Sequence, residues 1–171
     1  MSGKANLHST GQVGEYLVAS ELARLGFTIA MPTGNSPAVD IWAYRRKETR
    51  AIQVKTISKG AFQYTANKFF RIEFEGADGN EKQIIGDIHD YLDLNIDLLI
   101  VFLGSSIGND EFFCTKLKEF ASFSRNSYIE YVERHGGMRP GKNKRSVHAA
   151  HDKKNVIKSG IFTDLPKYFD E

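Results

Sequence analysis

The stretch that decides the fold is D-I-W-A-Y-R-R-K-E-T-R-A-I-Q-V-K, from Asp40 to Lys55. Residues 38–45 and 50–57 alternate in character and are rich in β-branched and aromatic side chains. The polar residues 46–49 between them supply a turn. The stretch therefore predicts a β-hairpin.

The two faces of this hairpin differ in chemistry. Side chains alternate along a strand, and directly opposed residues of an antiparallel pair share a face. If Asp40 opposes Gln53 or Lys55, these three polar residues share one face, within roughly 5–8 Å of one another. The other face is wholly apolar and should pack on the core. It carries Ile41, Ala43, Ile52 and Val54.

Length and composition are those of an ordinary folded domain. The chain has 171 residues, of which 41% are hydrophobic and 26% charged, so we expect one domain over residues 1–171. A single cysteine, Cys114, excludes an internal disulfide and a cysteine zinc cluster. We see no apolar signal-peptide core and no apolar run that could span a bilayer, so we expect a cytoplasmic protein without a membrane partner.

A helix is predicted before the hairpin, from about residue 10 to residue 25. Ser9 and Gln12 have the spacing of a capping box, which predicts the start of the helix. Gly26 is a natural residue to follow its last turn.

Glu15 falls on the apolar stripe of this helix, which Val18, Leu22 and Leu25 form. An unpaired carboxylate in a core is costly, so its position needs an explanation. One explanation is structural: Glu15 would lie in the first turn, where the helix dipole stabilises negative charge. The other is a role in a functional site.

The rest of the chain predicts further strands and helices. We expect a strand at 27–31, a loop at 32–37, a hairpin from 70–74 and 82–85, a short helical segment at 88–94, a buried central strand at 97–103, a strand at 111–114, and helices at 116–123 and 126–134.

Positive charge gathers in residues 134–158, a predicted basic loop. It holds eight lysines and arginines against one acid, Asp152, and so carries +7, which leaves −5 for the rest of a chain of net charge +2. Such a segment predicts a local site for a polyanion, with a solvated loop as the alternative. Its histidines, His135, His148 and His151, lack acids or cysteines at ligand spacing, so we do not assign them to a metal.

The polar residues of the helix and the hairpin have the chemistry of a magnesium site. Asp40 offers a carboxylate, Gln53 a side-chain carbonyl and Val54 a backbone carbonyl, which are the hard oxygen ligands that Mg²⁺ takes. Glu15 would reach the ion directly or through water. The metal would lower the pKa of a bound water, and the Lys55 ammonium would orient that water or stabilise the transition state. This set suits phosphodiester hydrolysis.

The pattern resembles the PD-(D/E)XK nuclease superfamily, in particular Mrr-type restriction endonucleases and archaeal Holliday-junction resolvases. The residues that carry the resemblance are Glu15, Asp40 and Gln53-Val54-Lys55, within a motif core at residues 9–60. The resemblance implies an α/β fold with a restriction-endonuclease-like αβββαβ core, in which helices flank a mixed central sheet. It also implies Mg²⁺ or Mn²⁺ as cofactor and DNA as substrate.

Two positions depart from the family's pattern. Val39 stands where a proline is usual before the aspartate, a position that varies in such enzymes. Gln53 takes the place of the second acid, as in the Mrr-like nucleases. Glutamine keeps one carbonyl ligand but lacks the negative charge, so metal binding should be weaker than with glutamate.

Three functions are open from the sequence. The first is a metal-dependent DNA endonuclease of restriction or repair type, expected to be a homodimer by analogy with enzymes that cut both strands. The second is a non-catalytic module on the same fold that binds nucleic acid or protein. The third is structural, with Asp40 and Lys55 forming only a cross-strand ion pair.

The first hypothesis assigns roles to two groups of residues. The catalytic residues would be Glu15, Asp40, Gln53 and Lys55. The residues that hold the DNA backbone would be Lys59, Arg139, Lys142, Lys144 and Arg145.

Overall fold

The structure is a computed structural model that describes residues 7–33, 38–77, 80–93, 95–139 and 145–170. In chain order its elements are α1 (Leu7–Arg24), β1 (Thr28–Ala30), β2 (Ile41–Arg45), β3 (Glu48–Ile57), β4 (Phe62–Thr65), η1 (Ala66–Lys68), β5 (Phe70–Glu75), β6 (Lys82–Ile88), η2 (Asp90–Asp93), β7 (Ile96–Phe102), β8 (Glu111–Lys116), α2 (Leu117–Glu133), β9 (His148–His151), α3 (Lys153–Lys158), β10 (Thr163–Asp164) and α4 (Leu165–Phe169).

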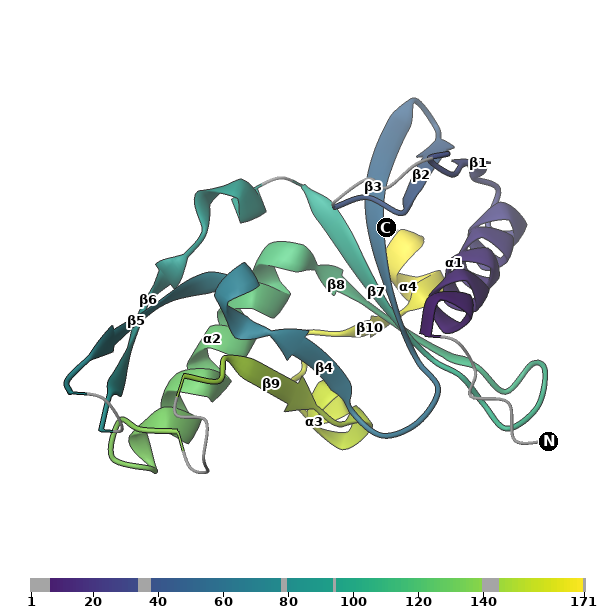
Figure 1. Ribbon diagram of the computed structural model, residues 1–171. Helices are drawn as coiled ribbons and strands as arrows, with labels where there is room; N and C mark the ends of the chain where they lie inside the picture. The colour runs from purple at the N-terminus through teal and green to yellow at the C-terminus, as the bar shows by residue number, and fades with distance from the viewer. Residues whose placement is uncertain (1–6, 34–37, 78–79, 94, 140–144, 171) are drawn as a thin grey trace.

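A six-stranded mixed sheet forms the centre, in the order β1-β2-β3-β7-β8-β10. Its central pair, β3 and β7, is parallel, and the other neighbouring strands are antiparallel. α1 and α4 lie on one side of this sheet and α2 on the other (Figure 1). The predicted fold class, a mixed sheet flanked by helices, is confirmed. Within the described part of the chain, no helix is both long and apolar enough to cross a membrane.

The predicted hairpin forms between β2 and β3, with a tighter turn than expected. Arg45 pairs with Glu48, so the turn is the two residues Arg46 and Lys47 rather than residues 46–49. Both turn residues have positive φ, 52° and 70°. This is the geometry of a type I′ turn, whose twist matches that of the strands it joins.

The apolar face of the hairpin is buried, as predicted, and it packs against α1. Its members share one buried cluster with the apolar stripe of the helix; the cluster includes Val18, Leu22, Ile41, Ala43, Ile52 and Val54. Gly14 allows a close approach, because a Cβ at this position would lie 1.8 Å from the Thr56 Oγ1. The first half of α1 is therefore held against the end of β3, next to Glu15.

The predicted start of α1 is wrong, whereas its predicted end is confirmed. The capping box is wrong, because α1 already includes Leu7 and Ser9 lies inside the helix. At the other end Gly26 has φ 83°. Its N–H donates to the Ala23 carbonyl, and the Phe27 N–H donates to the Leu22 carbonyl. These two bonds are the Schellman motif that the glycine predicts.

The helices predicted after the hairpin differ from those observed. The two predicted helices at 116–123 and 126–134 are the single helix α2, because Ser124 is buried in the core and does not interrupt the helix. The predicted helical segment at 88–94 is the 3₁₀ turn η2. Of the described residues between β3 and β7, none forms an α-helix; the chain passes through β4, η1, β5, β6 and η2 instead.

The hairpin predicted at residues 70–85 is confirmed as β5 and β6, and the buried central strand as β7, whose residues are all buried. By contrast, residues 134–158 are not a loop throughout, because they contain β9 and α3. β9 pairs with β4, with Phe62 opposite His151. The sequence pattern predicts neither strand of this small sheet, and it does not predict α3, β10 or α4.

The C-terminal helix α4 closes the side of the sheet that α1 covers. The Arg45 guanidinium donates to the Leu25 carbonyl at 2.9 Å and to the Phe169 carbonyl. The Tyr168 hydroxyl donates to Asp97 Oδ1 at 2.8 Å. Side chains of the hairpin and of β7 thus bind the end of the chain.

Candidate functional site

The candidate site lies where β3 extends past the start of β2. β3 pairs with β7 as far as Ile57, whereas its pairing with β2 begins at Ile52, opposite Ile41. The edge of β3 from residue 53 onward is therefore left uncovered by β2.

Asp40 lies at this edge, directly before β2. Its N–H donates to the Ile52 carbonyl at 2.8 Å, and its Oδ2 accepts a hydrogen bond from the Val54 N–H at 2.7 Å. In an extended strand the N–H and the carbonyl of one residue point to the same side. The Val54 carbonyl is therefore directed to the same edge as the Asp40 carboxylate.

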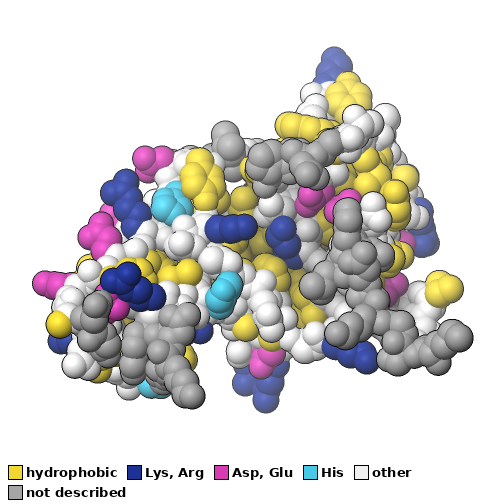
Figure 2. Space-filling view, viewed as in Figure 1, with side chains coloured by type: hydrophobic (Ala, Val, Ile, Leu, Met, Phe, Trp, Pro, Cys, Tyr) yellow, Lys and Arg dark blue, Asp and Glu magenta, His cyan; other side chains and the backbone are white. Residues whose placement is uncertain are grey.

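Five predicted site residues line one cavity of about 490 Å³ at this edge: Glu15, Asp40, Val54, Lys55 and Lys59. They come from α1, from the segment before β2, from β3 and from the loop that follows β3. Glu15 and Asp40 are half-buried, and neither is fully exposed to solvent. Figure 2 shows acidic and basic side chains close together on this face, below the β2–β3 hairpin.

Gln53 lies beside this cavity rather than in it. It lines an adjoining cavity of about 340 Å³, of which Lys55 also forms part of the wall. Gln53 and Lys55 therefore share a face, as strand alternation predicts. Lys68 of η1 lines the same adjoining cavity and is not among the predicted site residues. No signal in the sequence indicated it, because the fold of β4 and η1 beside β3 was not predicted.

Lys55 is a half-buried ammonium near two carboxylates. Among the residues that the structure describes, no ion pair joins Lys55 to Asp40 or to any other acid. The hypothesis that Asp40 and Lys55 serve only as a cross-strand ion pair is therefore not supported by a contact between them. The ammonium is positioned to meet an anion that enters the cavity.

The oxygen atoms that face the candidate cavity are of the type that binds a hard cation. The Asp40 and Glu15 carboxylates and the Val54 carbonyl are oxygen ligands, which Mg²⁺ combines with water. The set is small, however: over the described ranges, no three His, Cys, Asp or Glu side chains are grouped to hold a metal. Water would have to complete the coordination.

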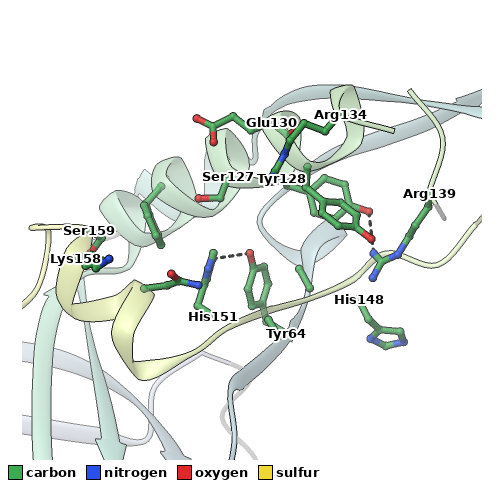
Figure 3. A pocket seen from close by; sticks show the side chains of 15 residues that line it. Tyr64, Ser127, Tyr128, Glu130, Arg134, Arg139, His148, His151, Lys158 and Ser159 are labelled. Atoms are coloured by element: carbon green, nitrogen blue, oxygen red, sulfur yellow. Dashed lines mark hydrogen bonds between the residues drawn. The ribbon is translucent and has the colours of Figure 1, made fainter. Parts of the chain in front are cut away.

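The residues predicted to hold the DNA backbone do not lie together. Lys59 lines the candidate cavity. Arg139 lines a different cavity of about 550 Å³ between α2, β9 and α3, where it donates to the Tyr128 hydroxyl and contacts the Tyr131 ring (Figure 3). The two cavities have no lining residue in common.

Of the remaining predicted DNA-binding residues, Arg145 lies away from the candidate cavity. Arg145 forms an ion pair with Glu81 and lowers the pKa of that carboxyl by hydrogen bonding. Lys142 and Lys144 lie outside the described residues.

His151 lines the cavity of about 550 Å³ and has a structural role there. Its Nε2 shares a hydrogen bond of 2.9 Å with the Tyr64 hydroxyl, and its ring stacks on Tyr64. Burial lowers the pKa of His151 from 6.5 to about 4 and raises the pKa of Tyr64 to about 12. His151 is therefore neutral at pH 7, and its ring is part of the core.

Comparison with protein-family models and with curated proteins gave no match. Among solved structures, the bacterial homing endonuclease I-Ssp6803I is 12% identical, with a TM-score of 0.41, and the match covers 70% of this chain and 74% of that chain. A likeness at this level is too loose to support a function, so the function has to be argued from the site.

Proposed function

We propose that the protein is a metal-dependent DNA endonuclease of the PD-(D/E)XK type, with a restriction or repair role. One observation carries the proposal: Glu15, Asp40 and Lys55, from three separate parts of the chain, line one cavity at an uncovered strand edge. Two carboxylates and an ammonium at the same place are the groups that phosphodiester hydrolysis needs.

The Asp40 carboxylate, the Glu15 carboxylate and the Val54 carbonyl would hold Mg²⁺ or Mn²⁺, with Gln53 acting from the adjoining wall. The bound ion would lower the pKa of a water and offset charge on the phosphate. The hydrogen bond from the Val54 N–H fixes the orientation of Asp40. Lys55 would orient the attacking water or stabilise the negative charge that develops on the phosphate.

The DNA backbone would be held by cations around the two adjoining cavities. Lys59 lines one cavity and Lys68 the other, with Lys55 between them. Such phosphate contacts fix the position of the substrate but carry no sequence information. Cutting both strands with one such site requires a second copy of the chain, so a homodimer is part of this proposal.

Nicking of a supercoiled plasmid in Mg²⁺ or Mn²⁺ tests the proposal. We expect the wild type to nick, and Asp40→Ala and Lys55→Ala each to lose about 10²–10³-fold in rate, the loss typical of removing one electrostatic group from an active site. The matched controls are Glu75→Ala and Lys154→Ala, an acid and a lysine that are exposed elsewhere. Metal-dependent nicking that survives in Asp40→Ala would overturn the assignment.

A second candidate is a module that binds nucleic acid without cutting it. The small donor set favours it, because two carboxylates bind a metal more weakly than three and Gln53 adds no charge. This candidate predicts DNA binding without nicking in either metal. Calorimetric titration with Mn²⁺ separates the two candidates, since the enzyme must bind the ion and Asp40→Ala must weaken that binding.

A further inference from the structure

Two aromatic side chains are exposed on the strand that leads away from the candidate site. Trp42 is 44% exposed and Tyr44 is 49% exposed. Large aromatic side chains dominate the energetics of protein interfaces, so an exposed pair at adjacent positions on one strand face suggests a contact surface.

This aromatic pair lies on the same face of the sheet as the candidate lysine. Ile41 and Ala43 are buried against α1, so alternation directs Trp42 and Tyr44 to the opposite face. Trp42 is paired with Ala51 of β3. From Ala51, alternation along β3 brings Gln53 and then Lys55 to the same face.

Spacing along β2 connects the pair to the site. Each step of two residues advances about 6.8 Å, so Trp42 and Tyr44 follow Asp40 at about 7 and about 14 Å along the strand. α2 packs chiefly on β6, β7 and β8. Figure 2 shows hydrophobic side chains at the top of this face, directly below the tip of the hairpin.

Positive charge lies at both ends of the aromatic pair. Beyond Tyr44 the turn carries Arg46 and Lys47, both exposed, and on the other side lie the lysines of the candidate site. Cations that flank flat aromatic rings match a polyanion whose bases can stack, and both features are those of surfaces that bind single-stranded nucleic acid.

We propose that Trp42 and Tyr44 form a stacking platform for unpaired bases, so that the substrate is DNA with a single-stranded segment beside the phosphate to be cut. The proposal rests on the nuclease function proposed above. In a duplex the base faces are hidden in the stack, whereas unpaired bases expose them to aromatic rings. The open face of the sheet thus selects for unpaired nucleotides.

Binding without catalysis provides the test. Trp42 is the only tryptophan of the chain, so its fluorescence reports on this surface alone. In EDTA we expect a single-stranded oligonucleotide to quench Trp42 and to bind more tightly than a duplex of the same sequence. Trp42→Ala should lower the affinity for the single strand by about 10-fold or more, measured by anisotropy of the labelled DNA, and should leave duplex binding within twofold.

Two variants serve as controls for this loss. Trp42→Phe keeps a stacking ring and should retain most of the affinity. Phe74→Ala removes a strand aromatic that is 36% exposed on the other hairpin, and it should change nothing. Equal losses on single strand and duplex, or no quenching of Trp42, would show that the platform is wrong.

Other outcomes separate the platform from the enzyme. A dimer in sedimentation that dissociates in Trp42→Ala would overturn the platform, because a second copy would then cover this face. If the wild type nicks plasmid but Trp42→Ala binds single strands normally, the stacking platform is wrong and the nuclease proposal stands. If Trp42 selects single strands but no metal supports cutting, the platform stands and the nuclease fails.

Discussion

At the scale of single residues, His151 shows how burial sets a chemical property. Its ring is buried between Tyr64, Phe120 and Phe123, and this burial lowers its pKa to about 4 from an ordinary 6.5. The unfolded chain therefore binds a proton at this histidine more readily than the folded chain does. The contribution of the neutral His151 ring to the free energy of unfolding is complete above pH 6.5 and is lost as the pH falls towards 4.

This histidine gives a prediction about acid stability. We expect the free energy of unfolding to fall by up to about 3 kcal/mol between pH 6.5 and pH 4 through His151. His151→Gln keeps a polar partner for Tyr64 without the titration, so urea unfolding at a series of pH values should show a flatter dependence in this variant. An exposed histidine offers the control, because His148→Gln should leave the slope unchanged. Parallel slopes in the wild type and His151→Gln would contradict this account.

At the scale of elements, the β2–β3 hairpin combines a strained turn with a proposed function. Arg46 and Lys47 both have positive φ, where Asn-Gly is the favoured pair. A left-handed conformation costs a residue other than glycine roughly 1–2 kcal/mol. The chain thus places two cations at the tip of the hairpin at a cost in stability, which is consistent with a role for their charge in binding a polyanion.

Replacing the turn residues separates stability from binding. The double variant Arg46→Asn/Lys47→Gly should be more stable by about 1 kcal/mol, which raises the melting temperature by about 3 °C in a chain of this size. The same variant should bind single-stranded DNA more weakly and with a shallower salt dependence, because two cations are lost. A lower melting temperature, or an unchanged salt slope, would argue against this interpretation of the turn.

The elements also show which parts of the fold local sequence patterns can predict. The hairpin, its faces and the end of α1 at Gly26 follow from alternation and turn chemistry within a few residues. β4 and β9 could not be predicted in this way, since Phe62 and His151 pair across a long separation. The site is intermediate: strand parity predicts that Gln53 and Lys55 share a face, but only the tertiary fold brings Lys68 beside them.

At the scale of the whole molecule, two buried clusters lie on opposite faces of the central sheet. One contains Phe169 of α4 together with the apolar stripe of α1. The other contains Phe120 of α2, the aromatic residues of β4, and Phe69. β7 contributes to both, with Leu99 in the first cluster and Ile100 in the second. A strand shared in this way should couple the two clusters into one cooperative unit.

Two core truncations test this coupling, and with it the single domain expected from the sequence. Phe169→Ala and Phe120→Ala each remove a fully buried ring and should each cost about 3–5 kcal/mol. Because the clusters share β7, we expect both variants to lower the midpoint of a single urea transition. Trp42 fluorescence, which reports on the hairpin, and far-ultraviolet circular dichroism, which reports on all helices, should then coincide. If Phe120→Ala unfolds in two steps while Trp42 stays native through the first, the α2 side is a separate unit, and the candidate site depends on the α1 side alone.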